Sequence, residues 1–160
     1  ARFKYQLSTT LNCSPSDLNA LVVGGHGDTT MIPLIKHATW NSIPVTQFLD
    51  EAQQQTIIND TMVGGATLTK LLGTSAWYAP GAAGAALVES IVRDEKKLFT
   101  CCVSLDGEYG QSDICLGVPV VIGKNGWEKI VAMDLSADEQ AAFNKSADAV
   151  RNMNDVLKTL

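Results

Sequence analysis

The first part of the chain changes its apolar spacing several times, which predicts short elements. Apolar residues first recur at helical spacing, and further on an aliphatic run ends at two glycines. Ser14, Pro15 and Asp17 form the cap and first turn of a short second helix. The expected elements are helices over 2–11 and after Ser14, a strand over 20–23, an extended segment over 28–33 and a connecting or edge segment over 43–45.

Helical spacing dominates the middle of the chain. Apolar residues recur at intervals of three and four over 46–72, and Gly64 and Gly65 interrupt that pattern. We therefore predict two helical pieces with a break at the two glycines. Residues 76–93 carry alanines together with Leu87 on one helical face. Such a small-residue face is suited to close packing against a sheet or another helix.

Three strands are predicted next. Two apolar runs, over 98–105 and 113–122, are separated by a Gly-rich turn. Asn125 and Gly126 supply the positive φ of a tight hairpin, which leads into a third strand over 127–133. Consecutive strands joined by short turns pair side by side, so these three form an antiparallel meander.

The chain ends in a predicted amphipathic helix. Ser136 and Glu139 form a capping box, and Phe143, Ala147 and Val150 lie on one face of the helix that follows. That apolar face is expected to pack on the meander. The elements together predict an α+β fold, an antiparallel sheet with packed helices, without internal repeat or second domain.

Composition narrows the class of partner. The chain has 160 residues, 46% of them hydrophobic, and a net charge of −5. Twelve scattered Lys and Arg form no basic stripe, which argues against binding to nucleic acid or to an anionic membrane. The longest apolar runs are about half of what a membrane-spanning helix needs. We expect a soluble domain, and because the sequence opens on Ala1 without an initiator Met, a piece of a longer protein.

The four cysteines lack the spacing of a metal site. Cys13, Cys101, Cys102 and Cys115 fall mostly in strand-like apolar runs, with no CxxC or Cys/His pattern. This arrangement favours buried free thiols in a reducing cytoplasm. We predict no metal site.

His26 is the strongest candidate for chemistry. It lies within Gly-Gly-His-Gly-Asp, directly after the strand predicted over 20–23. Glycines allow the backbone to approach a ligand, and an imidazole exchanges protons near neutral pH, which is the profile of a general acid/base. A purely structural histidine is the alternative. Asp28 either orients the imidazole or caps the following turn, and His37, among polar neighbours, is interpreted as a surface residue.

Two further side chains are candidate ligand contacts. Arg2 opens the first helix, where it is either a solvated residue or a bidentate clamp for a carboxylate. Ser75 lies at the Gly-rich start of the helix over 76–93 and either donates a hydrogen bond to a ligand or caps that helix. No Gly-x-Gly-x-x-Gly follows an N-terminal strand, so no nucleotide-binding half is predicted within the chain.

Three segments in order carry a family resemblance. They are Ala-Arg-Phe-Lys over 1–4, Gly-Gly-His-Gly-Asp over 24–28 and Gly-Thr-Ser-Ala-Trp-Tyr-Ala-Pro over 73–80. Over essentially its whole length the chain resembles the C-terminal, catalytic half of the lactate/malate dehydrogenases. The likeness is greatest to bacterial malate dehydrogenases of lactate-dehydrogenase-like type.

The resemblance implies roles for the three candidates. His26 matches the family's proton acceptor, Arg2 its substrate-carboxylate arginine, and Ser75 a position near the substrate pocket. The implied activity is that of an oxidoreductase of the tricarboxylic acid cycle, the interconversion of malate and oxaloacetate. Residues 1–160 would be the substrate-binding, catalytic domain. NAD would be held mainly by an N-terminal Rossmann domain that this sequence does not include, and the implied assembly is a dimer or tetramer.

The chain departs from the family pattern at its start. The family aspartate that pairs with the histidine precedes the position of Ala1, so we expect the isolated chain to be inactive. Two alternatives stay open at this point: the C-terminal domain of a lactate dehydrogenase, and a non-enzymatic oligomerisation module of the same fold.

Overall fold

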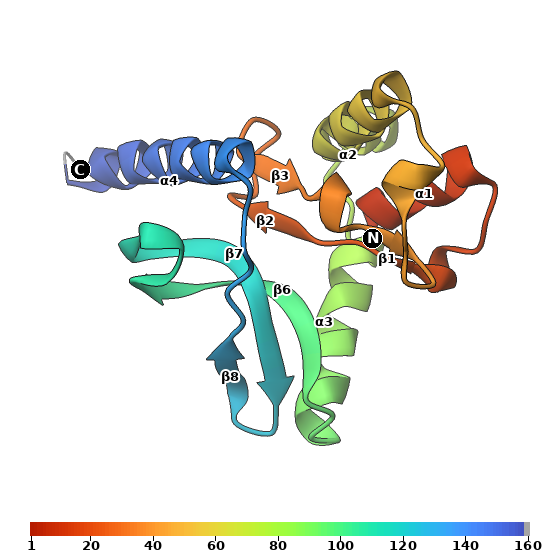
Figure 1. Ribbon diagram of the computed structural model, residues 1–160. Helices are drawn as coiled ribbons and strands as arrows, with labels where there is room; N and C mark the ends of the chain where they lie inside the picture. The colour runs from red at the N-terminus through yellow and green to blue at the C-terminus, as the bar shows by residue number, and fades with distance from the viewer. Residues whose placement is uncertain (159–160) are drawn as a thin grey trace.

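The computed structural model describes residues 1–158, which form four long helices and two antiparallel sheets (Figure 1). The helices are α1 (Arg2–Leu11), α2 (Glu51–Leu72), α3 (Tyr78–Val92) and α4 (Ala137–Leu157). The strands are β1 (Leu18–Asn19), β2 (Val22–Gly24), β3 (Met31–Pro33), β4 (Thr39–Trp40), β5 (Ile43–Pro44), β6 (Lys97–Asp106), β7 (Ser112–Gly123) and β8 (Gly126–Ile130). The predicted α+β class is confirmed.

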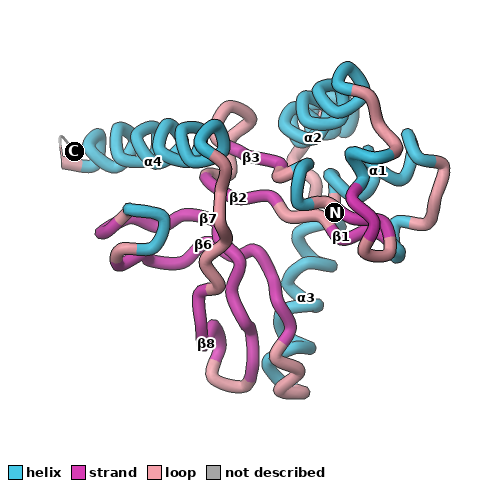
Figure 2. The backbone as a smooth tube through the Cα atoms, viewed as in Figure 1, coloured by secondary structure: helices cyan, strands magenta, loops and turns pink. Residues whose placement is uncertain are grey.

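The larger sheet has two strands more than the predicted meander. β7 pairs antiparallel with β6 and with β8, as the hairpin signals indicate (Figure 2). β7 also pairs with β2, which in turn pairs with β3. The short strands β1, β4 and β5 form a separate three-stranded sheet. The β2–β3 hairpin therefore extends from the large sheet toward the part of the fold that contains α1 and α2.

A close backbone approach joins the hairpin to β7. Gly24 is paired with Gly117, and a Cβ added at Gly117 would lie 2.9 Å from the carbonyl oxygen of Gly24. Gly24 itself has φ of 88°, a conformation that glycine adopts without strain. β2 and β7 cannot move apart without breaking this pairing, so the close approach of the two strands requires glycine at position 117.

Gly117→Ala is expected to destabilise the chain by about 1–3 kcal/mol, because the new methyl group meets backbone rather than a flexible side chain. Gly81→Ala in α3 is the matched control. A Cβ there meets nothing within 4 Å, and alanine gains about 0.5–1 kcal/mol over glycine inside a helix. Urea unfolding of the two variants measures both values. Equal stability of the two variants would contradict the close approach.

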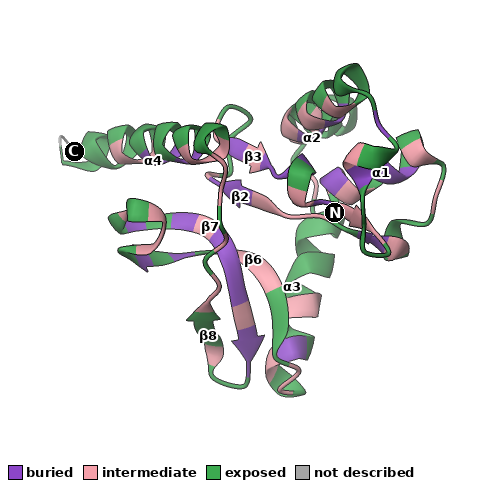
Figure 3. Ribbon diagram, in the orientation of Figure 1, coloured by how far each residue is buried: buried purple, intermediate pink, exposed green. Residues whose placement is uncertain are grey.

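α4 begins as predicted and packs on the large sheet. The Ser136 hydroxyl accepts from the backbone N–H of Glu139, whose carboxylate accepts in return from the N–H of Ser136. Phe143 and Ala147 are fully buried in one apolar cluster with β7 residues such as Leu116 and Val118. Figure 3 shows buried positions along both α4 and β7.

His37 links α4 to the segment after β3. Its Nε2 lies 3.4 Å from a carboxylate oxygen of Glu139. Burial by itself raises the pKa of Glu139, but the Ser136 N–H and hydroxyl together with His37 outweigh it, so the pKa is lowered. The expectation that His37 is a surface residue is therefore only partly right, because its side chain is 29% exposed and paired.

α2 is one continuous helix, and the predicted break at Gly64 and Gly65 is wrong. An Asp50–Gln53 capping box opens it, and Gly73, in the left-handed conformation at φ 70°, ends it. Ile57 anchors it in a second apolar cluster with Phe3 and Leu7 of α1. Tertiary packing thus overrides the low helix propensity of two adjacent glycines.

α3 runs beside the large sheet and exposes most of its surface (Figures 1 and 3). Its buried Ser90 donates a hydrogen bond of 2.8 Å to the carbonyl oxygen of Ile122 in β7. On its outer side Tyr78 is 84% exposed and Val92 is 77% exposed. The packing predicted for this small-residue face is therefore confirmed for Leu87 and Ser90 and wrong for Ala82 and Ala83, which are exposed.

The cysteines are less buried than predicted. Cys102 and Cys115 are exposed, and Cys13 and Cys101 are partly buried. Cys102 and Cys115 lie on the outer face of β6 and β7, because in a strand alternate residues point to opposite faces and only the other set reaches the core.

Candidate functional site

His26 lies at the tip of the β2–β3 hairpin, and the backbone on both sides of it is fixed. The N–H of Gly25 donates to the carbonyl oxygen of Thr30 at 3.2 Å. The N–H of Gly27 donates to the Thr30 hydroxyl at 2.9 Å, and the N–H of Thr30 donates to the carbonyl oxygen of Gly27 at 3.0 Å. The loop is thus a closed turn that presents one imidazole.

The imidazole of His26 is exposed and, within residues 1–158, makes no hydrogen bond. Asp28 is exposed as well and neither orients the ring nor caps the turn, so both of its predicted roles are wrong within the described structure. Thr30 holds the turn instead. His26 is therefore free to meet a ligand or a carboxylate supplied from outside this chain.

Arg2 spans the gap between α1 and α2. Its Nη1 donates to the carbonyl oxygen of Met62 in α2 at 3.3 Å, and its Nη2 lies 3.9 Å from the sulfur of Met31 in β3. Both acceptors are uncharged, and among the described residues Arg2 has no ion pair. The half-buried Arg2 side chain therefore has no carboxylate partner there and keeps several unused donors, which is what a carboxylate ligand requires.

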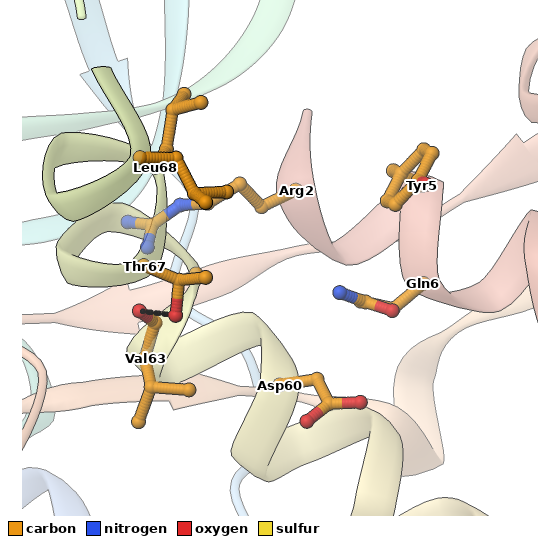
Figure 4. A pocket seen from close by; sticks show the side chains of 9 residues that line it. Arg2, Tyr5, Gln6, Asp60, Val63, Thr67 and Leu68 are labelled. Atoms are coloured by element: carbon orange, nitrogen blue, oxygen red, sulfur yellow. Dashed lines mark hydrogen bonds between the residues drawn. The ribbon is translucent and has the colours of Figure 1, made fainter.

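The glycines of α2 make room for this arginine. A Cβ at Gly65 would lie 2.9 Å from Nη1 of Arg2, and one at Gly64 would lie 3.3 Å from its Cδ. Gly64 and Gly65 therefore leave the space that the Arg2 side chain occupies. Figure 4 shows the side chain reaching from α1 to α2, where the guanidinium lies beside Thr67 and Leu68.

An open pocket of about 490 Å³ adjoins the guanidinium. Its walls are α1 and α2, with Tyr5 and Gln6 on one side and Val63 and Leu68 on the other (Figure 4). Asp60 lines the pocket but does not pair with Arg2. The pocket is largely apolar with one unpaired cation at its edge.

β3 brings Arg2 and the His26 loop to the same end of the hairpin. Met31, which contacts the Arg2 guanidinium, is paired with Gly24, and Gly24 lies two residues before His26. The structure thus brings an exposed imidazole and a guanidinium without an ion pair, which are 24 residues apart in sequence, to one short strand.

Ser75 is not joined to them within residues 1–158. It is exposed in the segment between α2 and α3 and makes no hydrogen bond to Arg2 or His26 in the described structure. It does not cap α3 either, because that helix begins after Trp77 without a side-chain cap. The capping alternative is wrong, and a ligand contact of Ser75 stays a prediction.

Sequence reasoning missed Ser146. This residue is 3% exposed on α4, where its hydroxyl bonds to Gly25 and Thr30. Its only local signal is a serine on the otherwise apolar face that carries Phe143 and Ala147. A polar residue at a core position needs partners, and here the partners come from the His26 loop.

The described residues offer neither a metal site nor a membrane span. No cluster of His, Cys, Asp and Glu among residues 1–158 is arranged to hold a metal ion. No helix of the described structure is both long and apolar enough to cross a membrane.

Comparison with known proteins matches this arrangement to a family. Residues 1–159 match the lactate/malate dehydrogenase alpha/beta C-terminal domain. Malate dehydrogenase of Bacteroides thetaiotaomicron is 61% identical over 158 residues, 99% of this chain and 50% of that protein. Malate dehydrogenase of Flavobacterium johnsoniae is 60% identical over 160 residues, 100% of this chain and 51% of that protein. The chain spans about half the length of the curated relatives it matches.

Solved structures of malate and lactate dehydrogenases contain the same fold. Cryptosporidium parvum malate dehydrogenase has a TM-score of 0.95 and 41% identity, with 99% of this chain and 52% of that chain covered. Eimeria maxima lactate dehydrogenase with NADH and oxamate has a TM-score of 0.94 and 34% identity, with 98% and 49% covered. This chain therefore belongs to the lactate/malate dehydrogenase family, as its alpha/beta C-terminal domain.

Proposed function

We propose that the full-length protein containing this chain is a malate dehydrogenase that interconverts malate and oxaloacetate with NAD. The observation that carries the proposal is that β3 connects two side chains without a charged partner: Met31 contacts the Arg2 guanidinium and is paired with Gly24, two residues before the exposed His26. Relatives at about 60% identity that are named malate dehydrogenase support the same substrate.

His26 is the general acid/base. In malate oxidation the neutral imidazole takes the proton of the 2-hydroxyl group while the C2–H bond breaks and a carbonyl forms at C2. In the reverse direction the imidazolium returns that proton to oxaloacetate. The fixed turn around His26 holds the ring where the proton moves, which avoids reorganisation during the reaction.

Arg2 holds the C1 carboxylate of the substrate through two parallel N–H bonds. This fork fixes the direction of the adjacent C2 atom relative to His26. Ser75, exposed between α2 and α3, would add a hydrogen bond to the bound substrate. The neutral partners of Arg2 preserve its charge, and the apolar walls beside it strengthen the attraction to an anion.

The described residues do not fit a dinucleotide, because no Gly-rich turn leads from a strand into a helix N-terminus there. NAD, the hydride acceptor, would therefore be bound by residues outside this chain. The carboxylate that pairs with His26 would come from the same missing part. We infer that the isolated 160-residue chain has no turnover.

An assay with both substrates tests the proposal. The full-length protein is expected to oxidise malate with kcat/KM at least about 10²-fold above that for lactate, and the 160-residue chain alone is expected to be inactive. The absorbance of NADH at about 340 nm, followed over minutes, measures the rate with each substrate for the full-length protein and for the isolated chain. A preference for lactate would establish the lactate dehydrogenase alternative. Malate turnover by the isolated chain would contradict the need for the missing half.

Self-association accompanies the proposed activity. Tyr78 and Val92 of α3 and Leu71 of α2 are each more than three quarters exposed, which favours coverage by other protein. We propose a dimer or tetramer, in the cytoplasm given four cysteines without disulfide or metal spacing. The non-enzymatic oligomerisation module is the second candidate. A full-length protein that assembles in light scattering but turns over neither substrate would favour it.

A further inference from the structure

Ser146 is a polar side chain in the interior of the α4–sheet interface. It is 3% exposed, and its neighbours on the helix, Phe143 and Ala147, are fully buried. A buried hydroxyl is costly unless both its donor and its acceptor capacity are used. A serine at this position therefore has to be explained by its partners.

Both partners belong to the loop that carries His26. The Ser146 hydroxyl accepts from the backbone N–H of Gly25 at 2.8 Å and donates to the carbonyl oxygen of Thr30 at 2.7 Å. Gly25 immediately precedes His26, and Thr30 closes the turn behind it. One hydroxyl thus joins the two ends of the loop, although Ser146 lies 121 residues after Gly25 and 116 residues after Thr30.

The glycines before His26 are matched to this contact. A Cβ at Gly24 would lie 2.8 Å from the Ser146 oxygen and 2.7 Å from the Thr30 carbonyl oxygen. A Cβ at Gly25 would lie 2.6 Å from the Thr30 hydroxyl oxygen and 3.4 Å from that of Ser146. The glycines, Ser146 and Thr30 therefore form one closely fitted unit beneath His26 (Figure 1 shows the loop beside α4).

We propose that Ser146 is a positioning residue for His26: its hydroxyl fixes Gly25 and Thr30, and so sets the direction in which α4 and the hairpin present the imidazole. The inference rests on the proposed function of His26 as acid/base. Ser146 itself touches no reacting atom. Its effect falls on the rate of proton transfer rather than on substrate binding, because Arg2, which binds the carboxylate, donates to Met62 of α2 and meets the hairpin at the Met31 sulfur, not at Gly25 or Thr30.

Ser146→Ala in the full-length protein removes the hydroxyl and leaves Gly25 only its longer bond to Thr30. We expect kcat for malate oxidation to fall about tenfold with the malate KM within about twofold of wild type. Hydrogen exchange at the Gly25 amide is expected to accelerate. If Ser146→Ala does not fold, Ser146→Cys, a weak hydrogen-bond donor of similar shape, is measured with the same expected results.

Ser90→Ala is the matched control. Ser90 is also a fully buried helical serine that donates to a strand carbonyl oxygen, but its partner is Ile122, far along β7 from the loop. The control is expected to lose similar stability and to keep the wild-type kcat.

Two results overturn the proposal: a kcat of Ser146→Ala equal to wild type, or an equal loss of kcat in Ser90→Ala. His26→Asn is measured in the same series so that the failures can be told apart. If wild type does not oxidise malate, or His26→Asn retains its rate, the proposed function fails and the positioning role falls with it. If both behave as expected, the result for Ser146→Ala decides the positioning role alone.

Discussion

His26→Asn in the full-length protein is expected to lower kcat for malate oxidation by about 10²–10⁴-fold, the usual contribution of a general acid/base. Asparagine is polar and of similar size but cannot exchange a proton near neutral pH. The exposed imidazole has no structural hydrogen bond within residues 1–158, so the fold should be unaffected. Steady-state NADH formation gives the rate, and thermal unfolding checks the fold.

The second histidine of the chain provides the control. His37 pairs with Glu139 at 3.4 Å and lies on the segment after β3, outside the loop that carries His26. His37→Asn is expected to keep kcat within about twofold of wild type while losing up to about 1 kcal/mol of stability from the partly exposed pair. A His26→Asn variant with the rate of His37→Asn would exclude His26 as the proton carrier.

Local signals in the sequence predicted most of the elements. The capping boxes and turn residues mark helix starts and hairpins through contacts between residues three or four apart. α4 begins at Ala137 after Ser136, and the Asn125-Gly126 hairpin joins β7 to β8, both as predicted. Such contacts are contained in a short window of sequence, and for this reason they can be read without knowledge of the fold.

The errors concern contacts between distant residues. Gly64 and Gly65 look like a helix break because glycine has low helix propensity, but Arg2, more than 60 residues earlier, needs the space that they leave. The pairing of Gly24 with Gly117 likewise has no local signal, so β2 and β3 were not assigned to the large sheet. Long-range packing decided both cases.

The residues of the candidate site likewise divide into those with a local sequence signal and those that depend on long-range contacts. His26 and Arg2 are identifiable because their residue types and settings suit proton transfer and carboxylate binding. Ser146 is not, because serine is an ordinary helix residue and its partners at Gly25 and Thr30 are known only from the folded chain. Asp28 and Ser75 received capping roles from their local settings, and the structure uses neither residue in that way.

Arg2→Gln is expected to lower kcat/KM for malate by about 10²–10⁴-fold, because two charge-assisted hydrogen bonds to the substrate carboxylate are lost. Arg2→Lys keeps the charge but not the planar fork, so its loss should be smaller, roughly 10–10²-fold. Arg93→Lys is the control, since Arg93 is 67% exposed and pairs with Glu89 on the surface. If Arg2→Lys behaves like Arg93→Lys, the fork geometry is not required.

Gly65→Ala tests the position of the Arg2 guanidinium without removing its charge. The new methyl group would lie 2.9 Å from Nη1, and because that atom ends a flexible side chain, the guanidinium moves rather than the helix. Alanine also favours the helix over glycine by up to about 1 kcal/mol. Gly65→Ala should therefore raise the unfolding midpoint slightly and yet raise the malate KM by roughly tenfold. A variant that gains stability with an unchanged KM would show that substrate binding does not depend on where α2 holds Arg2.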